Sequence, residues 1–176
     1  MADLATIGVY GFTSETFLAA LRGAGIRLLV DVRQRRGVRG SEYAWANSKR
    51  LQAALAAAGV AYEHRPDLAP TTELRRLQYA VDDRAGVGKR SREELAPEFV
   101  ERYRDEILAS ADLGSLAEAA RARGPAALLC VERDPEACHR SLIAARLRED
   151  SDLEVADLRP QGLGPEVSRR VGRLTP

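Results

Sequence analysis

Short apolar runs alternate along the chain with segments whose apolar residues recur at helical spacing. The apolar runs predict buried strands, because aliphatic residues without polar interruption suit a sheet that is covered on both faces. The predicted strands are residues 5–10, 26–32, 60–64, 126–131 and 153–158. Helical spacing, with Ser14, Asn47 and Asp134 as N-caps, predicts the helices. These helices cover residues 14–23, 47–58, 97–108, 113–123 and 134–148.

Strands that alternate with helices indicate the fold class. The pattern predicts a three-layer α/β domain with a mainly parallel sheet of about five strands and helices on both faces. We expect this single domain to span residues 1–159, with a helical and loop insertion at about 66–125. Within the insertion, residues 73–81 suggest a helix and 83–92 a basic loop. We expect a loose C-terminal tail over 160–176, which is rich in Pro, Gly and Arg.

Length and composition fit an ordinary globular protein. The 176 residues are 45% hydrophobic and 30% charged, which excludes long disorder and a transmembrane bundle. The chain start lacks the basic-then-apolar layout of a signal peptide, so we expect a cytoplasmic protein without a membrane partner. The net charge of +1 disfavours attraction of nucleic acid by the whole molecule. Of the 27 basic residues, however, only Lys49 and Lys89 are lysines, and arginine forks suit local phosphate contacts.

Polar side chains gather where the predicted strands end. In open parallel sheets, ligands bind beyond the carboxyl ends of the strands, so we expect these side chains to converge on one edge. Arginines there would hold phosphate, an aspartate would orient a hydroxyl, and a tyrosine would contact the ligand. These candidates are Arg33, Arg39 and Arg140 for phosphate, Asp31 for the hydroxyl, and Tyr10 and His139 as further ligand contacts.

Residues 130–141 form the most specific segment of the chain. Cys130 and Glu132 share one face of a strand, and Glu132 falls at the strand tip, where a carboxylate can act as acid, base or nucleophile. Cys138 would lie in the first turns of the next helix, whose partial positive charge lowers a thiol pKa. Because neighbouring helical residues point about 100° apart, we do not expect His139 to serve as the base for Cys138.

We expect no metal, no cofactor and no disulfide. The C-x7-C-H spacing is unlike the usual zinc spacings, and a chain without an export signal disfavours a structural disulfide. The glycine fingerprint of NAD enzymes, the Walker A motif and the G-x-S-x-G elbow are all absent from the sequence. Their absence excludes a Rossmann dehydrogenase, a P-loop NTPase and an α/β-hydrolase.

The same segment resembles a family signature. Its order C-x-E-x-x-P-x-x-C-H-R is similar to the signature of the bacterial family named domain of unknown function 488. Residues 6–11, 29–33 and 51–62 resemble that family's first strand and turn, its D-V-R strand end and its G-I-x-Y strand. The resemblance covers about residues 5–158 and implies an α/β fold with a ligand edge. It implies that this edge comprises Asp31, Arg33, Glu132, Cys138, His139 and Arg140.

Three functions follow as hypotheses. The first is a phosphate- or nucleotide-handling site in which Glu132 acts on a nucleoside, nucleotide or nucleic-acid bond, with a small phosphorylated ligand as partner. The second is a non-catalytic nucleic-acid-binding module, in which the basic loop 33–39 grips the backbone and Tyr43 and Trp45 stack on bases. The third is a thiol enzyme with Cys138 as its nucleophile.

Overall fold

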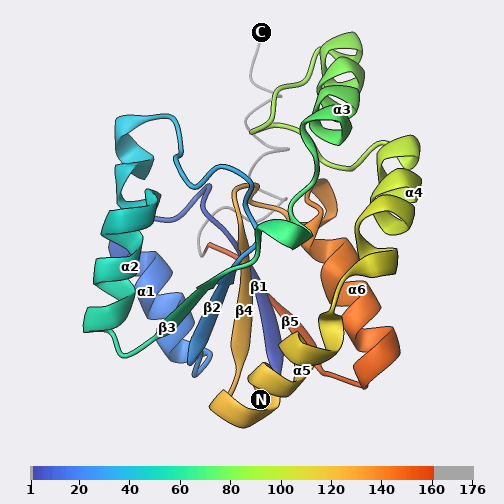
Figure 1. Ribbon diagram of the computed structural model, residues 1–176. Helices are drawn as coiled ribbons and strands as arrows, with labels where there is room; N and C mark the ends of the chain where they lie inside the picture. The colour runs from blue at the N-terminus through green and yellow to red at the C-terminus, as the bar shows by residue number, and fades with distance from the viewer. Residues whose placement is uncertain (1, 161–176) are drawn as a thin grey trace, which may run out of the picture.

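The computed structural model describes residues 2–160, in which one parallel sheet lies between two layers of helices (Figure 1). All five strands are parallel and lie in the order β3-β2-β4-β1-β5, which confirms the predicted α/β class. The register pairs β4 with both β1 and β2, so β4 lies at the centre. The strands are β1 (Leu4–Gly8), β2 (Leu28–Asp31), β3 (Ala61–His64), β4 (Ala126–Cys130) and β5 (Val155–Leu158).

Two hydrophobic clusters hold the layers together. One packs α1 and α2 against one face of the sheet, and the other packs α4, α5 and α6 against the opposite face. Helix α3 stands beyond one end of the strands (Figure 1). The helices are α1 (Ser14–Gly23), α2 (Ser48–Ala57), α3 (Thr72–Ala85), α4 (Pro97–Glu106), α5 (Leu113–Arg123) and α6 (Arg140–Ser151). Short 3-10 turns are η1 (Ser41–Ala46), η2 (Pro66–Leu68), η3 (Leu108–Ser110) and η4 (Pro135–Ala137).

The burial of the strands explains their composition. Every residue of β1, β2 and β4 is buried, because helices cover both faces and a neighbouring strand lies on each side. The edge strands β3 and β5 contain only half-buried and exposed residues. An edge strand has a neighbour on one side only, so fewer of its atoms are covered.

None of the three side chains predicted as N-caps forms a capping hydrogen bond to its helix. Helix α1 is capped by Thr13 rather than by Ser14: the Thr13 hydroxyl accepts from the Thr16 amide at 3.3 Å, and the Thr16 hydroxyl accepts from the Thr13 amide at 2.9 Å. Asn47 does precede α2, but its side chain accepts from the Val38 amide at 2.8 Å. The Asn47 side chain therefore fixes the preceding loop instead of capping the helix.

The segment after β4 corrects the prediction of one helix over 134–148. The chain makes the 3-10 turn η4, becomes extended at Cys138 (φ −140°, ψ 141°), and enters α6 only at Arg140. The Asp134 carboxylate does not cap a helix, because it pairs instead with Arg133 at 2.8 Å and Arg159 at 3.0 Å. Cys138 therefore lies before the helix and not in its first turns.

The predicted insertion contains three helices, α3, α4 and α5. Helix α3 is longer than the predicted 73–81 and runs to Ala85, where Gly86 ends it in a left-handed conformation (φ 68°). The predicted loop 83–92 is therefore helical in its first residues. Within residues 2–160, no helix is long and apolar enough to cross a membrane. The expected loose tail lies, apart from Pro160, outside the described residues.

Candidate functional site

A pocket of about 680 Å³ opens at the carboxyl edge of the sheet. Residues 130–132 at the end of β4 line it, together with the loops that follow β1 and β2. Helix α3 and the loop 88–95 provide further lining residues from the insertion. The pocket therefore lies where open parallel sheets bind their ligands.

The pocket lining is strongly basic. Seven cationic side chains line the pocket together with a single carboxylate, that of Glu132. Opposite charges in a partly desolvated cleft attract more strongly than in bulk water, so this lining favours an anionic occupant. The cations are Arg33, Arg35, Arg39, Arg75, Lys89, Arg90 and Arg92.

Three of these cations have no carboxylate partner among residues 2–160. They are Arg35, Arg39 and Arg75, whereas the other four each form an ion pair. The Nε atom of Arg75 is buried and donates to no acceptor in the described chain. Buried donors are nearly always hydrogen-bonded, so this atom marks a place for an acceptor from a ligand or from water.

The rings of Tyr10 and Tyr43 lie beside Arg90, and Tyr10 and Arg90 line the pocket. The Arg90 guanidinium carbon lies 5.2 Å from the ring centres of both Tyr10 and Tyr43, and the two rings are 5.0 Å apart. Arg90 also pairs with Glu42 at 3.3 Å. Tyr10, a ligand contact in our sequence analysis, thus lines the pocket as expected.

Glu132 lies at the centre of a buried charge network. Its Oε1 accepts from Arg92 at 3.0 Å and lies 3.5 Å from the Lys89 ammonium, and its Oε2 accepts from the Cys130 thiol at 3.3 Å. Arg92 continues to Asp82 at 2.8 Å, which links the strand end to α3. Although burial alone would lower the pKa of Lys89, the Glu132 charge raises that pKa above its ordinary value. Glu132 was predicted from the sequence. Asp82 was not, because its partner Arg92 lies ten residues away in a loop.

Asp31 and Arg33 form a buried, two-pronged ion pair. The Arg33 Nε and Nη2 atoms donate to the two carboxylate oxygens of Asp31 at 2.8 and 2.7 Å, and Nη1 donates to the Ala46 carbonyl at 3.0 Å. The Tyr62 hydroxyl donates to Asp31 at 2.7 Å. Arg33 lines the pocket, but each of its three guanidinium nitrogens already donates to one acceptor, and Asp31 is not among the lining residues. This geometry ties the loop after β2 to the sheet.

Arg140 lies behind the pocket rather than on it. Its guanidinium donates to the Thr6 hydroxyl at 3.2 Å and to the carbonyls of Glu132 and Arg133 at 2.7 and 2.9 Å. The residue is 1% exposed and is not among the lining residues. Of the three arginines expected to bind phosphate, only Arg39 both lines the pocket and lacks a carboxylate partner among residues 2–160.

Cys130, Cys138 and His139 form a buried thiol–imidazole cluster. Their donor atoms all lie within 4.8 Å of one another, and His139 Nδ1 is 3.8 Å from each sulfur. The prediction that His139 points away from Cys138 was wrong. It assumed that both residues lie in one helix, whereas Cys138 is extended and precedes the helix. His139 Nε2 lies 3.1 Å from the Val32 carbonyl. A carbonyl only accepts, so Nε2 carries the proton and Nδ1 faces the sulfurs.

The two thiols of this cluster differ in acidity. Burial alone would raise the pKa of Cys138, but a hydrogen bond with Cys130 and the charge of Arg140 lower it well below its ordinary value. Burial, Cys138 and Glu132 together raise the pKa of Cys130 well above the usual range. Of the two thiols, Cys138 is therefore the more acidic.

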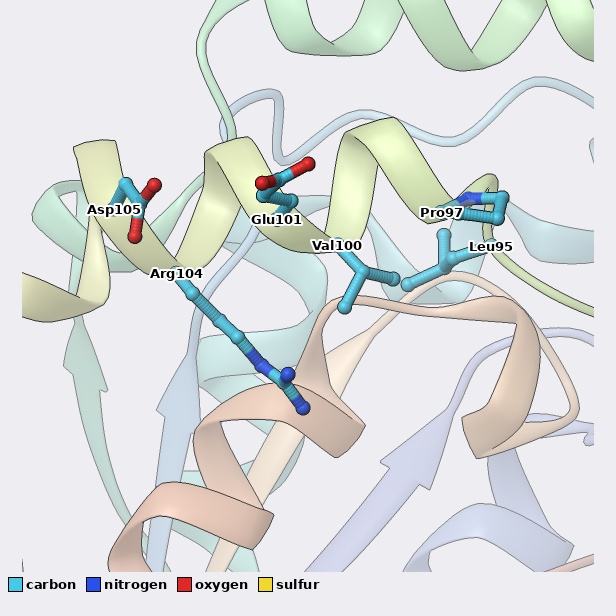
Figure 2. Close-up of a pocket in the computed structure, with 6 residues that line it drawn as sticks. All are labelled: Leu95, Pro97, Val100, Glu101, Arg104 and Asp105. Carbon is cyan, nitrogen blue, oxygen red and sulfur yellow. The ribbon is translucent and has the colours of Figure 1, made fainter.

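A second hollow, of about 570 Å³, lies along α4 (Figure 2). Its charged residues are of both signs, and Figure 2 shows the carboxylates of Glu101 and Asp105 directed away from the Arg104 guanidinium. All three are exposed, and no buried polar group joins them. We therefore assign no site there. The remaining lining residues are Leu95, Pro97 and Val100.

A match to a known protein family covers most of the described fold. A protein-family model described as "Domain of unknown function DUF488" matches residues 13–147. This span runs from the cap of α1 into α6 and contains every strand except β1 and β5. No curated protein and no solved structure matches the chain.

Proposed function

The chain belongs to the DUF488 family, and we propose that its function is to handle a small phosphorylated ligand in the pocket at the carboxyl edge of the sheet. One observation carries the proposal: seven cationic side chains and one carboxylate line the same pocket. Guanidinium and ammonium groups bind phosphate through charge-assisted hydrogen bonds, and guanidinium does so with two parallel donors. The pocket of about 680 Å³ also lies within the range of about 300–1,000 Å³ common for small-molecule sites.

The three cations without a described carboxylate partner are the proposed phosphate ligands. Arg35 and Arg39 come from the loop after β2, and Arg75 comes from α3. A buried donor without an acceptor costs about 1–3 kcal/mol, and a phosphate oxygen at Arg75 Nε would remove that cost. The ligand would thus bridge the sheet edge and the insertion.

Glu132 is the proposed reactive group. It supplies the only carboxylate among the pocket-lining residues, and Arg92 and Lys89 hold its Oε1 in place. A carboxylate fixed beside a bound nucleotide can act as base or nucleophile at the glycosidic or phosphate bond. Glu132→Gln retains the side-chain shape, so this variant should bind the ligand and lose turnover. Turnover equal to that of the wild type would refute the catalytic role.

The binding test compares ligands that differ only in phosphate. We expect AMP, ribose 5-phosphate and inorganic phosphate to raise the melting temperature, and adenosine to leave it unchanged. A ligand at 100 times its dissociation constant adds about 2.7 kcal/mol, which is about 5–11 °C for a chain of this size. Isothermal titration calorimetry then gives the dissociation constants.

Two arginine variants give the matched comparison. The double variant Arg39→Ala, Arg75→Ala should weaken binding at least about tenfold, which corresponds to about 1.4 kcal/mol. The control variant Arg146→Ala also removes an arginine charge, but from an exposed position on α6. It should bind the phosphorylated ligand as the wild type does. The proposal fails if no phosphorylated compound binds, or if the control loses as much affinity as the pocket variant.

The nucleic-acid hypothesis has less support in this geometry. The Trp45 ring packs on Phe17 with 4.9 Å between centroids, and Arg90 lies over the Tyr43 ring. Neither aromatic side chain is free to stack on a base in this arrangement. The same thermal-shift panel includes short DNA and RNA. If only these oligonucleotides bind, and if salt abolishes that binding, the result would favour this alternative over a small ligand.

A further inference from the structure

The thiol–imidazole cluster of Cys130, Cys138 and His139 has no part in the proposed phosphate contacts. We propose that these three side chains bind a thiophilic divalent transition-metal ion, of which zinc is the type. All three line the pocket, yet none is more than 6% exposed. Two thiols and an imidazole are the soft and borderline donors that zinc selects in proteins.

The spacing of the donor atoms fits a single ion. Zinc lies about 2.3 Å from sulfur and about 2.0 Å from nitrogen, so a tetrahedral centre holds a sulfur and a nitrogen ligand about 3.5 Å apart. His139 Nδ1 is 3.8 Å from the sulfur of Cys130 and 3.8 Å from that of Cys138. An ion would therefore draw the donors together by only about 0.3 Å in each of these two sulfur–nitrogen pairs, and the two sulfurs lie within 4.8 Å of one another.

The surroundings of His139 resemble those of a metal ligand. A metal-binding imidazole commonly donates its second N–H to a carbonyl or carboxylate, which fixes the tautomer and the ring orientation. His139 Nε2 meets the Val32 carbonyl at 3.1 Å, and the Tyr103 ring packs beside the imidazole with 5.5 Å between centroids. These contacts leave Nδ1, with its lone pair, toward the two sulfurs.

A fourth ligand is within reach. Glu132 Oε2 lies 3.3 Å from the Cys130 sulfur, so a small rotation of the carboxylate can bring it to the same ion. Metal binding displaces the thiol protons, which leave to solvent, and two thiolates then neutralise the dication. Arg92 and Lys89 lie against Glu132 and balance its charge. The ion can enter from the pocket, because all four side chains line it.

The first test uses the reduced wild-type chain and Co²⁺ as a spectroscopic probe. After reduction with a phosphine and removal of metal by a chelator, Co²⁺ is titrated in buffer without phosphate. We expect one equivalent to bind, with thiolate-to-cobalt charge-transfer absorption and the visible bands of a tetrahedral ion, and Zn²⁺ to displace it. A folded chain that binds no Co²⁺ and no Zn²⁺, or that binds Co²⁺ without the thiolate band, overturns the proposal.

Single variants then identify the ligands. Cys130→Ser, Cys138→Ser and His139→Gln should each weaken metal binding at least about tenfold. The control is His64→Asn, because His64 contacts the Arg33 carbonyl at 3.0 Å and does not line the pocket. Wild-type affinity in Cys138→Ser would refute the ligand assignment even if another variant fails to fold.

This inference does not depend on the phosphate proposal. The metal titration contains no phosphorylated compound, and the phosphate titration is carried out with a chelator present. Each proposal can therefore fail alone. If the thiols instead form a disulfide when a peroxide is added, and the reduced chain binds no metal, the cluster is a redox pair and the metal proposal is wrong.

Discussion

Asp31→Asn should destabilise the protein strongly, because it leaves the Arg33 guanidinium buried without its counter-charge. Asp31 is fully buried and Arg33 is 2% exposed. Two parallel hydrogen bonds of 2.8 and 2.7 Å join the side chains, and the Tyr62 hydroxyl donates to the same carboxylate at 2.7 Å. Asparagine keeps the shape but supplies one acceptor in place of two, and no charge.

The expected loss is large because of burial. Removal of one partner from a buried ion pair costs about 3–5 kcal/mol, whereas an exposed helical pair contributes about 0.3–0.5 kcal/mol. Arg146 and Asp150 form such an exposed pair, with side chains about half accessible. For a chain of this size, 3–5 kcal/mol lowers the melting temperature by about 6–20 °C. This is a sizeable part of a total stability of about 5–15 kcal/mol.

Urea unfolding followed by circular dichroism measures these free energies. The double-mutant cycle compares four proteins: wild type, Asp31→Asn, Arg33→Met, and the double variant. The double variant should lose less than the sum of the two single variants, because it leaves no buried charge unpaired. Arg146→Ala is the control and should change stability by less than about 1 kcal/mol. If Asp31→Asn stays within about 1 kcal/mol of the wild type, solvent screens the pair and the reasoning from burial is refuted.

Three further predictions concern single contacts. Gly8→Ala places a Cβ 1.8 Å from the Glu132 carbonyl oxygen, so the backbone must shift. The free energy of unfolding should therefore fall by about 1–3 kcal/mol or more. An unchanged melting temperature would contradict this close approach. Arg140→Lys loses the planar fork that reaches two backbone carbonyls and should cost about 1–3 kcal/mol in urea unfolding, an expectation that wild-type stability would refute. The hydrogen bond from Arg65 lowers the pKa of Asp67 below its ordinary 3.8, so the pair stabilises the fold at neutral pH and this stability is lost as pH falls through 3.8 and below. Asp67→Asn should therefore make unfolding free energy depend less steeply on pH in that range, and an unchanged slope would show that the pair contributes nothing.

The strands were predictable from the sequence because burial on both faces leaves a simple signal. Residues 126–131 contain no polar interruption, and 126–130 of them form the central strand β4. Helix starts were less predictable, because capping residues also have other partners. Asp134 and Pro135 begin a 3-10 turn and not α6, since the Asp134 carboxylate pairs with Arg133 and Arg159. These ion pairs compete with local capping, and spacing along the chain does not reveal the pair with Arg159.

The candidate site was predictable in position but not in its partners. Parallel topology alone brings the residues that follow β2 and β4 to one edge, so Arg39 and Glu132 were found. Arg75 was missed, because it comes from α3, and nothing in the sequence indicates that this helix closes over the sheet edge. The proximity of Cys130, Cys138 and His139 was not predicted for a related reason. Zinc spacing rules describe local loops, whereas here a strand end and an extended residue bring Cys130 and Cys138 together.

Glu132 lies between the two proposed sites, and its position predicts that they are coupled. Its Oε1 holds Arg92 and Lys89, which line the basic pocket, and its Oε2 faces the Cys130 sulfur. If the carboxylate turns toward a bound metal, it releases part of its hold on the two cations, and these then attract an anion more strongly. Bound Zn²⁺ should therefore tighten AMP binding, and AMP must tighten Zn²⁺ binding by the same factor, typically about 5–150-fold for coupled sites.

Calorimetric titration of AMP into the chain with and without one equivalent of bound Zn²⁺ measures this factor. In Glu132→Gln the factor should fall toward one, because the neutral amide holds both cations without a charge and ligates metal poorly. Coupling that persists in this variant would show that the metal attracts the phosphate directly. An AMP affinity that Zn²⁺ leaves unchanged in the wild type would show that Glu132 does not move between the two sites.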